Sequence, residues 1–273
     1  MGQASGDTGL DHDALDFGGY IECSPAAAGH FDSPLYHVDI TSLRAMHKPN
    51  RTAMTPERFA KLKRVLQQRQ TDLTILAEDV HKSHNIAAIR RSCDAVGVQT
   101  MHAVSPGGEV LRHHMSAAGT QAWVPVRMHD TVELACLELK QSGMTIAAAH
   151  FSSHAIDFRA WDYTAPCAIL LGSELRGVSD AAAQLADAHL TIPMEGMVAS
   201  LNVSVAAALI LYEAQRQRRC AGLYDRCRLE RDEYERLLFE WSHPDIARRC
   251  RSRGRPYPAL DEDGNMLSNP LRD

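Results

Sequence analysis

The sequence contains no apolar run that approaches the ~20 residues needed to span a bilayer as a helix. Its polar N-terminus lacks the basic-then-apolar pattern of a secretion signal. It also misses the myristoylation pattern, because Gly6 stands where Ser or Thr is required. These absences predict a cytoplasmic protein.

Local metal and redox motifs are missing as well. The seven cysteines form no C-x-x-C pair, which argues against a zinc ribbon or a thioredoxin-like site. Their odd number and apolar settings fit reduced thiols. The fourteen histidines include His81, His84, His113 and His114, but none forms an H-E-x-x-H or another ligand set at helical spacing. We therefore predict no metal site.

The common nucleotide-binding loops are also absent. No G-x-G-x-x-G follows a predicted strand, so a dinucleotide fold is not supported. Gly172 and Gly177 have the spacing of a Walker A motif, but Val178 and Ser179 replace its Lys-Ser/Thr.

Net charge is low, at -5, and it is unevenly distributed. Residues 1–50 hold seven acidic and two basic side chains, so the remainder of the chain is close to neutral. We interpret residues 1–52 as a poorly ordered acidic extension.

A basic amphipathic helix is predicted within residues 53–72. Thr55 and Pro56 form a helix start, and Phe59, Leu62 and Leu66 share one stripe while basic residues surround it. This helix is either a solvated face or an arm that contacts phosphates.

Strand-like and helix-like segments then alternate through residues 73–219. The predicted strands are 73–78, 99–105, 144–149, 167–172 and 190–193. The predicted helices are 85–96, 131–142, one from about Ser179 and a long one after Ser200. Continuous apolar strands separated by helices indicate an α/β fold with a parallel sheet covered on both faces. Ligands of such sheets bind beyond the carboxyl ends of the strands.

Residues 220–273 form an arginine-rich, helical C-terminal extension. Its cluster RRCRSRGR at 248–255 contains no acidic residue. This cluster is interpreted as a nucleic-acid or phosphate patch, with a solubilising tail as the alternative.

Three turns carry the candidate chemistry. They are the N-x5-R of Asn85 to Arg91, the LGSE-x-x-G of 171–177 and the IPM-x-G-x-V-x-SLNVSVA of 192–206. By themselves Ser200 and Asn202 fit helix caps, and the last stretch fits a strand, turn and core helix. Together the turns resemble the signature motifs of the SpoU/TrmH branch of the SPOUT methyltransferases, over about residues 53–260.

The resemblance implies a deep trefoil knot in the C-terminal half of the sheet, bound S-adenosylmethionine and an obligate homodimer. Cofactor contacts, largely through backbone groups, would fall on Ala149, Gly172, Ile192, Met194 and Leu201. Ala149 stands where relatives often have threonine, so a side-chain hydrogen bond is lost there.

The resemblance also implies a catalytic role for Arg91. The ribose 2'-hydroxyl is a poor nucleophile, and Arg91 would either take its proton or stabilise the developing oxyanion and position a phosphate. Ser200 and Asn202 would orient the ribose or the arginine, and Glu174 would hold the arginine or cap a turn.

For tRNA capture, the matching positions are Arg58, Lys61, Arg69 and Arg218. Lys61 replaces an arginine of some relatives, which weakens bidentate phosphate contact but keeps the charge. Within the family, the combination is most similar to members that methylate the 2'-hydroxyl of guanosine 18 in the tRNA D-loop. The alternatives are a SpoU-type enzyme acting on rRNA or on another tRNA position, and an RNA-binding knot protein without activity.

Overall fold

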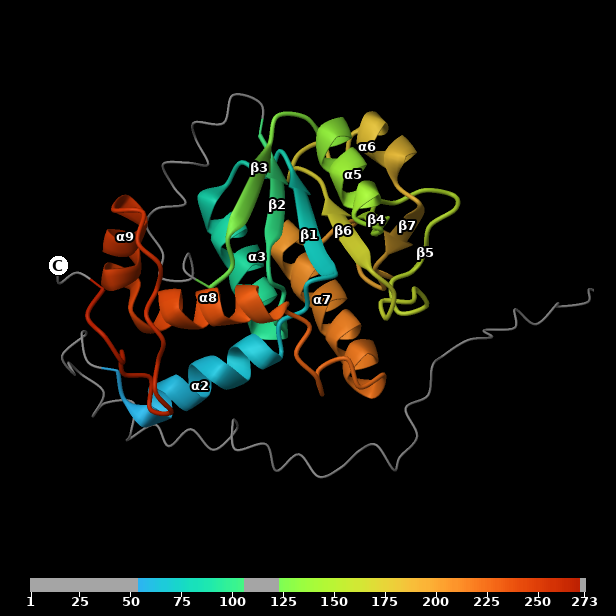
Figure 1. The fold of residues 1–273 in the computed structure, drawn as a ribbon. Helices are drawn as coiled ribbons and strands as arrows, with labels where there is room; N and C mark the ends of the chain where they lie inside the picture. Colours follow the sequence, from blue (N-terminus) through green and yellow to red (C-terminus); the bar gives the residue numbers. More distant parts are fainter. Residues whose placement is uncertain (1–53, 106–122, 271–273) are drawn as a thin grey trace, which may run out of the picture.

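The computed structural model describes residues 54–105 and 123–270 (Figure 1). The predicted acidic extension at 1–52 lies outside the described residues. Within them, no helix is long and apolar enough to cross a membrane.

A seven-stranded parallel sheet forms the centre of the molecule. Its strands are β1 (Leu73–Glu78), β2 (Met101–Val104), β3 (Val126–His129), β4 (Thr145–Ala149), β5 (Ile156–Asp157), β6 (Cys167–Leu171) and β7 (Ala188–Thr191). They are arranged in the order β3-β2-β1-β6-β4-β7-β5. Every residue of β1 and β6 is buried, as expected for strands covered on both faces.

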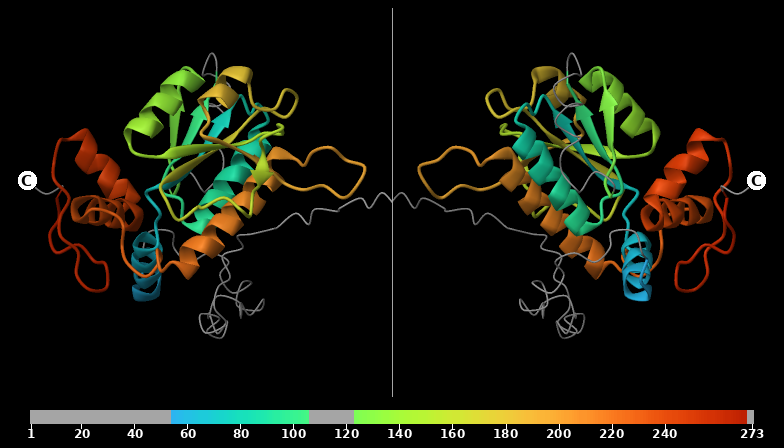
Figure 2. Two further views of the ribbon diagram at one scale, coloured as in Figure 1. Left: turned by 90° about the vertical axis from the view of Figure 1, so that its right-hand side faces the viewer. Right: turned by 90° about the vertical axis from the view of Figure 1, so that its left-hand side faces the viewer.

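Helices cover both faces of the sheet (Figures 1 and 2). On one face lie α3 (Ser83–Val96) and α7 (Val203–Cys220), whose apolar side chains pack with Ile169 and Leu171 of β6. On the other lie α5 (Val132–Gln141) and α6 (Asp180–Leu185), which pack with Ala168 and Leu170. Successive residues of β6 therefore point to opposite helix layers. The predicted α/β architecture is confirmed, whereas the knot stays a prediction.

The predicted elements all occur, with two strands added. Sequence reasoning missed β3 and β5, which have four and two residues. Both lie at edges of the sheet. Their half-exposed residues lack the continuous apolar pattern that marks the central strands.

The basic N-terminal helix is α2 (Pro56–Gln67), which begins at the predicted cap: the Thr55 hydroxyl accepts from the Arg58 amide. Its apolar stripe packs against α8 (Arg231–Ser242), which leads into α9 (Pro244–Ser252). The Trp123 and Trp241 rings meet edge-on in the same region. The arginine-rich extension is therefore attached to the N-terminal helix by an apolar contact.

Most of the described cysteines match the expectation of reduced thiols. Free thiols occur at Cys93, Cys136, Cys167, Cys227 and Cys250. Cys220 is disulfide-bonded, so the prediction is wrong at that position.

Candidate active site

The carboxyl ends of three neighbouring strands bring together three of the predicted cofactor residues. Ala149 is the last residue of β4, Gly172 follows β6, and Ile192 follows β7. Because β4 pairs with both β6 and β7, these residues lie along one edge of the sheet. Met194 and Leu201 belong to the loop between β7 and α7.

The turn after β6 is closed by its own backbone. The Ser173 amide donates to the Gly177 carbonyl and the Gly177 amide donates back to Ser173, at 3.0 and 2.9 Å. A Cβ at Gly172 would lie 2.0 Å from the carbonyl carbon of Gly177, well inside van der Waals contact. Only glycine therefore fits at 172.

The first turn of α7 is fixed by Asn202. Its side-chain oxygen accepts from the Ser204 amide at 2.9 Å and from the Ser204 hydroxyl at 2.6 Å, which makes it the N-cap. Its amide nitrogen points the other way and donates to the side-chain oxygen of Asn85 at 3.2 Å.

Asn85 continues this chain of hydrogen bonds to Glu174, donating to Oε1 at 2.6 Å. The side chains of Asn202, Asn85 and Glu174 thus link the three motifs across 117 residues of sequence. Sequence reasoning quoted Asn85 but gave it no role. The available signal was a polar residue on the buried stripe of α3.

Glu174 is held as a carboxylate. Partial burial opposes its ionisation, but hydrogen bonds from Asn85 and from the backbone amides of Glu174, Lys82 and His81 outweigh that effect and lower its pKa. An ionised Glu174 fixes Asn85 as the donor, which in turn leaves the Asn85 oxygen to accept from Asn202.

Arg91 and Ser200 lie outside this chain. Arg91 is exposed on α3, and within residues 54–105 and 123–270 its guanidinium has no hydrogen-bond or ion-pair partner. The preceding Arg90 is buried and donates to the Val124 carbonyl at 2.6 Å. Ser200 is exposed in the loop before α7. The fold therefore leaves the Arg91 guanidinium available to an anion from outside.

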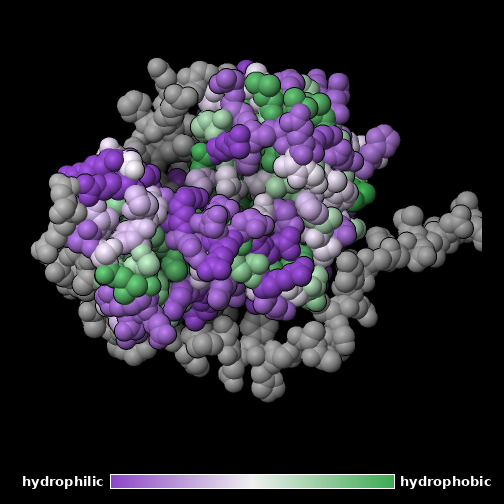
Figure 3. Space-filling view, in the orientation of Figure 1, coloured by the Kyte–Doolittle hydropathy of each residue, from purple (hydrophilic) through white to green (hydrophobic). Residues whose placement is uncertain are grey.

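The four predicted RNA contacts separate into two kinds. Arg58 and Lys61 are exposed on α2. Figure 3 shows the face of the molecule on which α2 and α8 lie, where hydrophilic residues surround smaller hydrophobic patches. These two side chains can meet phosphates.

Arg69 cannot contact tRNA in this fold, and that prediction is wrong. Its side chain is fully buried. It donates to the Val98 carbonyl at 3.0 Å and to the Asp94 carboxylate at 2.7 Å, and its guanidinium lies over the Trp241 ring. Arg69 joins α2 to α3 and α8.

The prediction for Arg218 is wrong for the same reason. Its side chain is fully buried and donates to Asp72 Oδ1 at 2.6 Å and to the Tyr163 carbonyl at 2.7 Å. Further bonds reach Gln70 Oε1 and the carbonyls of Asp72 and Ala165. Every donor points into the protein, so none remains for a phosphate.

Known proteins share both the central domain and the C-terminal extension. Residues 72–212 match the SpoU rRNA Methylase family, and residues 216–269 match the family "SpoU, rRNA methylase, C-terminal". The chain is 48% identical over 215 residues to the tRNA (guanosine(18)-2'-O)-methyltransferase of Escherichia coli K12, covering 78% of this chain and 94% of that protein. It is 51% identical over 187 residues to the enzyme of that name from Thermus thermophilus, covering 68% and 96%.

The fold is shared with a solved structure as well. The crystal structure of the A. aeolicus TrmH/SpoU tRNA modifying enzyme superposes with a TM-score of 0.62 at 40% identity. The match covers 68% of this chain and 94% of that one.

Proposed function

This chain belongs to the SpoU rRNA methylase family, and from that premise we propose that it methylates the ribose 2'-hydroxyl of guanosine 18 in tRNA, with S-adenosylmethionine as methyl donor. The similar proteins of E. coli and T. thermophilus carry this activity in their names, and the chain spans 94% and 96% of their lengths.

One structural observation gives the main support for the proposal. The Asn202–Asn85–Glu174 chain of hydrogen bonds joins three turns that lie at the carboxyl side of the sheet, which is where α/β proteins bind ligands. A protein that kept only the fold would have no need for three polar side chains in mutual contact at this edge, two of them at least partly buried.

The residues at the strand ends fit S-adenosylmethionine. Ala149 and Ile192 offer partly buried apolar surface, and the turn that begins at Gly172 follows the strand next to that of Ala149. An adenosine group needs an apolar slot with a few backbone donors and acceptors. When bound, the cofactor supplies an electrophilic methyl group on a sulfonium centre.

Arg91 is the proposed catalytic residue. Its exposed guanidinium is free of protein partners among the described residues, so it can pair with a substrate phosphate and stabilise negative charge on the 2'-oxygen. Arginine keeps its proton throughout the physiological pH range and is a reluctant base. We therefore assign it the electrostatic role, with the proton leaving to phosphate or water.

Asn202, Ser200 and Glu174 act as positioning residues in this proposal. Asn202 is fixed by its cap and by Asn85, while Ser200 lies two residues before it on the loop that faces the substrate. Glu174 holds Asn85 in a single orientation. Arg58 and Lys61 supply phosphate contacts that set affinity and salt dependence rather than sequence choice.

We also propose that the protein is a homodimer. Val205, Leu209 and Tyr212 are exposed at helical spacing on α7. Met197 and Val198 are exposed on the loop before it, which projects from the body in Figure 2. A second copy of the chain would cover these exposed apolar side chains. The proposed location is the cytoplasm, where tRNA is used.

The test is methyl transfer from labelled S-adenosylmethionine to an unmodified tRNA transcript, with mapping of the modified nucleotide. The wild type should label guanosine 18, and a transcript with adenosine at that position should remain unlabelled. Arg91→Ala should lose ~100-fold or more of the rate and still bind cofactor. Arg91→Lys keeps the charge without the planar fork and should recover part of the rate.

Two results would contradict the proposal. Label on rRNA alone, or at another tRNA position, would replace the substrate and retain the chemistry. Intact transfer by Arg91→Ala would remove Arg91 from the mechanism.

A further inference from the structure

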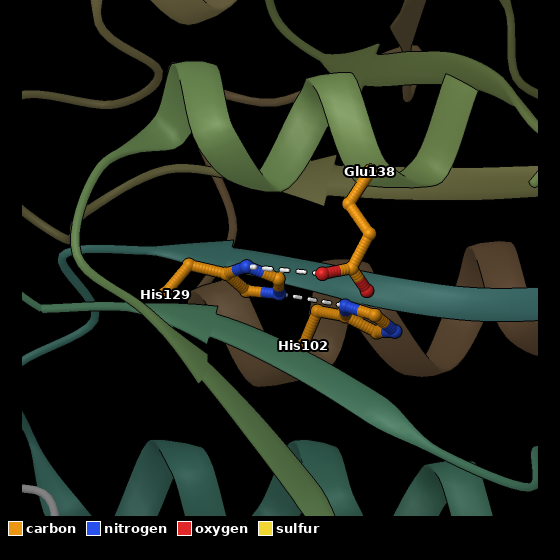
Figure 4. Close-up of side chains that lie close together, drawn as sticks. All are labelled: His102, His129 and Glu138. Atoms are coloured by element: carbon orange, nitrogen blue, oxygen red, sulfur yellow. Dashed lines mark hydrogen bonds and ion pairs between the residues drawn. The ribbon is translucent and has the colours of Figure 1, made fainter. Parts of the chain in front are cut away.

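Two histidines and a glutamate, none of them part of the Asn202–Asn85–Glu174 chain, meet where α5 covers the edge of the sheet (Figure 4). In the β2–β3 register, His102 lies opposite Arg127 and Val104 lies opposite His129. Because side chains alternate along a strand, His102 and His129 point to the same face. Val104 packs against α5 on that face, and α5 contributes Glu138.

The ligand-type atoms of these residues are close together. His102 Nδ1 lies 2.8 Å from His129 Nε2, and His129 Nδ1 lies 4.0 Å from Glu138 Oε2. One such atom from each of the three residues falls within 4.8 Å of the others. Among the described residues, no other group of three His, Cys, Asp or Glu side chains has its ligand-type atoms this close together.

The environment favours neutral imidazoles. His102 is 8% exposed, and the His129 side chain is 6% exposed. Burial, with His129 and Arg127 adding to it, lowers the pKa of His102 to about 4. Burial likewise lowers the pKa of His129. A neutral imidazole is the form that binds metal ions.

We propose that His102, His129 and Glu138 bind a single divalent transition-metal ion, with Zn²⁺ the best match, at a site that joins β2 and β3 to α5. Two imidazole nitrogens and a carboxylate oxygen form a donor set that suits Zn²⁺. The partly exposed Glu138 leaves room for water as a fourth ligand.

Binding requires the side chains to shift, because His129 faces His102 with Nε2 and Glu138 with Nδ1, and one imidazole gives a single ion only one nitrogen. With His129 Nε2 as the ligand atom, the Glu138 carboxylate must turn from Nδ1 towards the ion. Nitrogens ~2.0 Å from a tetrahedral ion lie roughly 3.3 Å apart, so the two rings must separate by about half an ångström from their present 2.8 Å. The ion replaces the hydrogen bond between the rings. The hydrogen bond between the rings requires a proton on one of the two nitrogens and none on the other. A bound ion accepts a lone pair from both nitrogens.

Arg127 competes with the ion. It pairs with Glu138 Oε2 at 2.8 Å, but its side chain is 60% exposed and can turn towards water. Its positive charge weakens metal binding by repulsion. Removal of Arg127 should therefore strengthen binding.

This proposal departs from the expectation of no metal site. The ligands are separated by 27 and 9 residues in sequence and lie on two strands and a helix. No spacing rule for a single helix or loop could have found them.

The test uses the full chain, freed of metal by a chelator and then titrated with Zn²⁺ against a chromophoric competitor. The wild type should bind about one equivalent more than Glu138→Gln or His102→Asn, or bind it at least about tenfold more tightly. Zn²⁺ should raise the Tm of the wild type and not that of either variant. Co²⁺ should give tetrahedral visible absorption in the wild type only.

Matched controls separate this site from other histidines and acids. Glu133→Gln changes an exposed acid on the same helix, and His154→Asn changes an exposed histidine elsewhere. Both should behave as the wild type, and Arg127→Ala should bind Zn²⁺ more tightly. Because Glu138 is half-buried on a surface helix, its variant tests the proposal even if His102→Asn does not fold. Equal binding by the wild type and Glu138→Gln, or a Tm unaffected by Zn²⁺, would overturn the proposal.

Discussion

Substitution of Arg218 directly tests whether this arginine, near the end of a long helix, stabilises the folded protein or binds RNA. Its guanidinium donates to Asp72, Gln70 and three backbone carbonyls and has no exposure to solvent. Replacing it by methionine removes the charge and leaves those acceptors without their donor. Breaking a buried ion pair by removing one partner costs ~3–5 kcal/mol.

The lower end of that range applies here. Asp72 keeps a second partner in Arg228, so its carboxylate is not left as an isolated buried charge. We expect Arg218→Met to lose about 3 kcal/mol in the free energy of unfolding, measured by urea denaturation. At ~2–4 °C per kcal/mol for a chain of this size, the Tm should fall by roughly 6–12 °C.

Salt dependence of tRNA binding provides the second measurement. Each phosphate contact adds about 1 to the slope of log K against log salt concentration. Arg218→Met should leave the slope unchanged in the fraction that remains folded. Arg58→Ala, on the exposed face of α2, should show the reverse: a reduced slope with stability within about 0.5 kcal/mol of the wild type. A stable Arg218→Met protein with a reduced slope would refute the assignment of Arg218 to the interior.

Three further predictions concern other parts of the molecule. Gly172→Ala should abolish cofactor binding and lower the Tm, since its Cβ would overlap the Gly177 backbone; unchanged binding by calorimetry would show that the turn can open. In the presence of a chelator, stability should fall on acidification from about pH 6.5 to about pH 4, because the lowered pKa of His102 means that the unfolded chain binds a proton first. His102→Asn should flatten that part of the pH–stability curve, and an unchanged curve would count against it. Leu209→Glu should yield monomers by light scattering and sedimentation, because a charge would enter the proposed dimer surface; a dimeric variant would place the interface elsewhere.

The central fold could be predicted from sequence because its signals are local. Runs such as 73–78 and 167–171 are apolar without alternation, which identifies strands covered on both faces. Thr55, Ser179 and Asn202 mark helix starts, and each serves as an N-cap in the structure. The predicted strands 144–149, 167–172 and 190–193 likewise place Ala149, Gly172 and Ile192 at strand ends. The edge strands β3 and β5 were missed because short, half-exposed segments carry no such signal.

Burial of polar side chains was decided by the tertiary structure alone. Arg69 and Arg218 read as basic residues on helix surfaces, yet both are interior. Arg69 is enclosed by α3 and α8, and Arg218 by the segments that precede β1 and β6. Helical periodicity gives the direction in which a side chain points about the helix axis. It does not indicate which other elements pack against that side chain.

Contacts between distant segments were likewise beyond the sequence. Asn85 meets Glu174 and Asn202 because the strand order places their turns at one edge. His102, His129 and Glu138 meet because β2 and β3 pair in a particular register beneath α5. The sequence determined the elements and the residues at their ends. The order and register of the strands determined which of those residues act together, because only packing brings side chains from separate elements within hydrogen-bond distance.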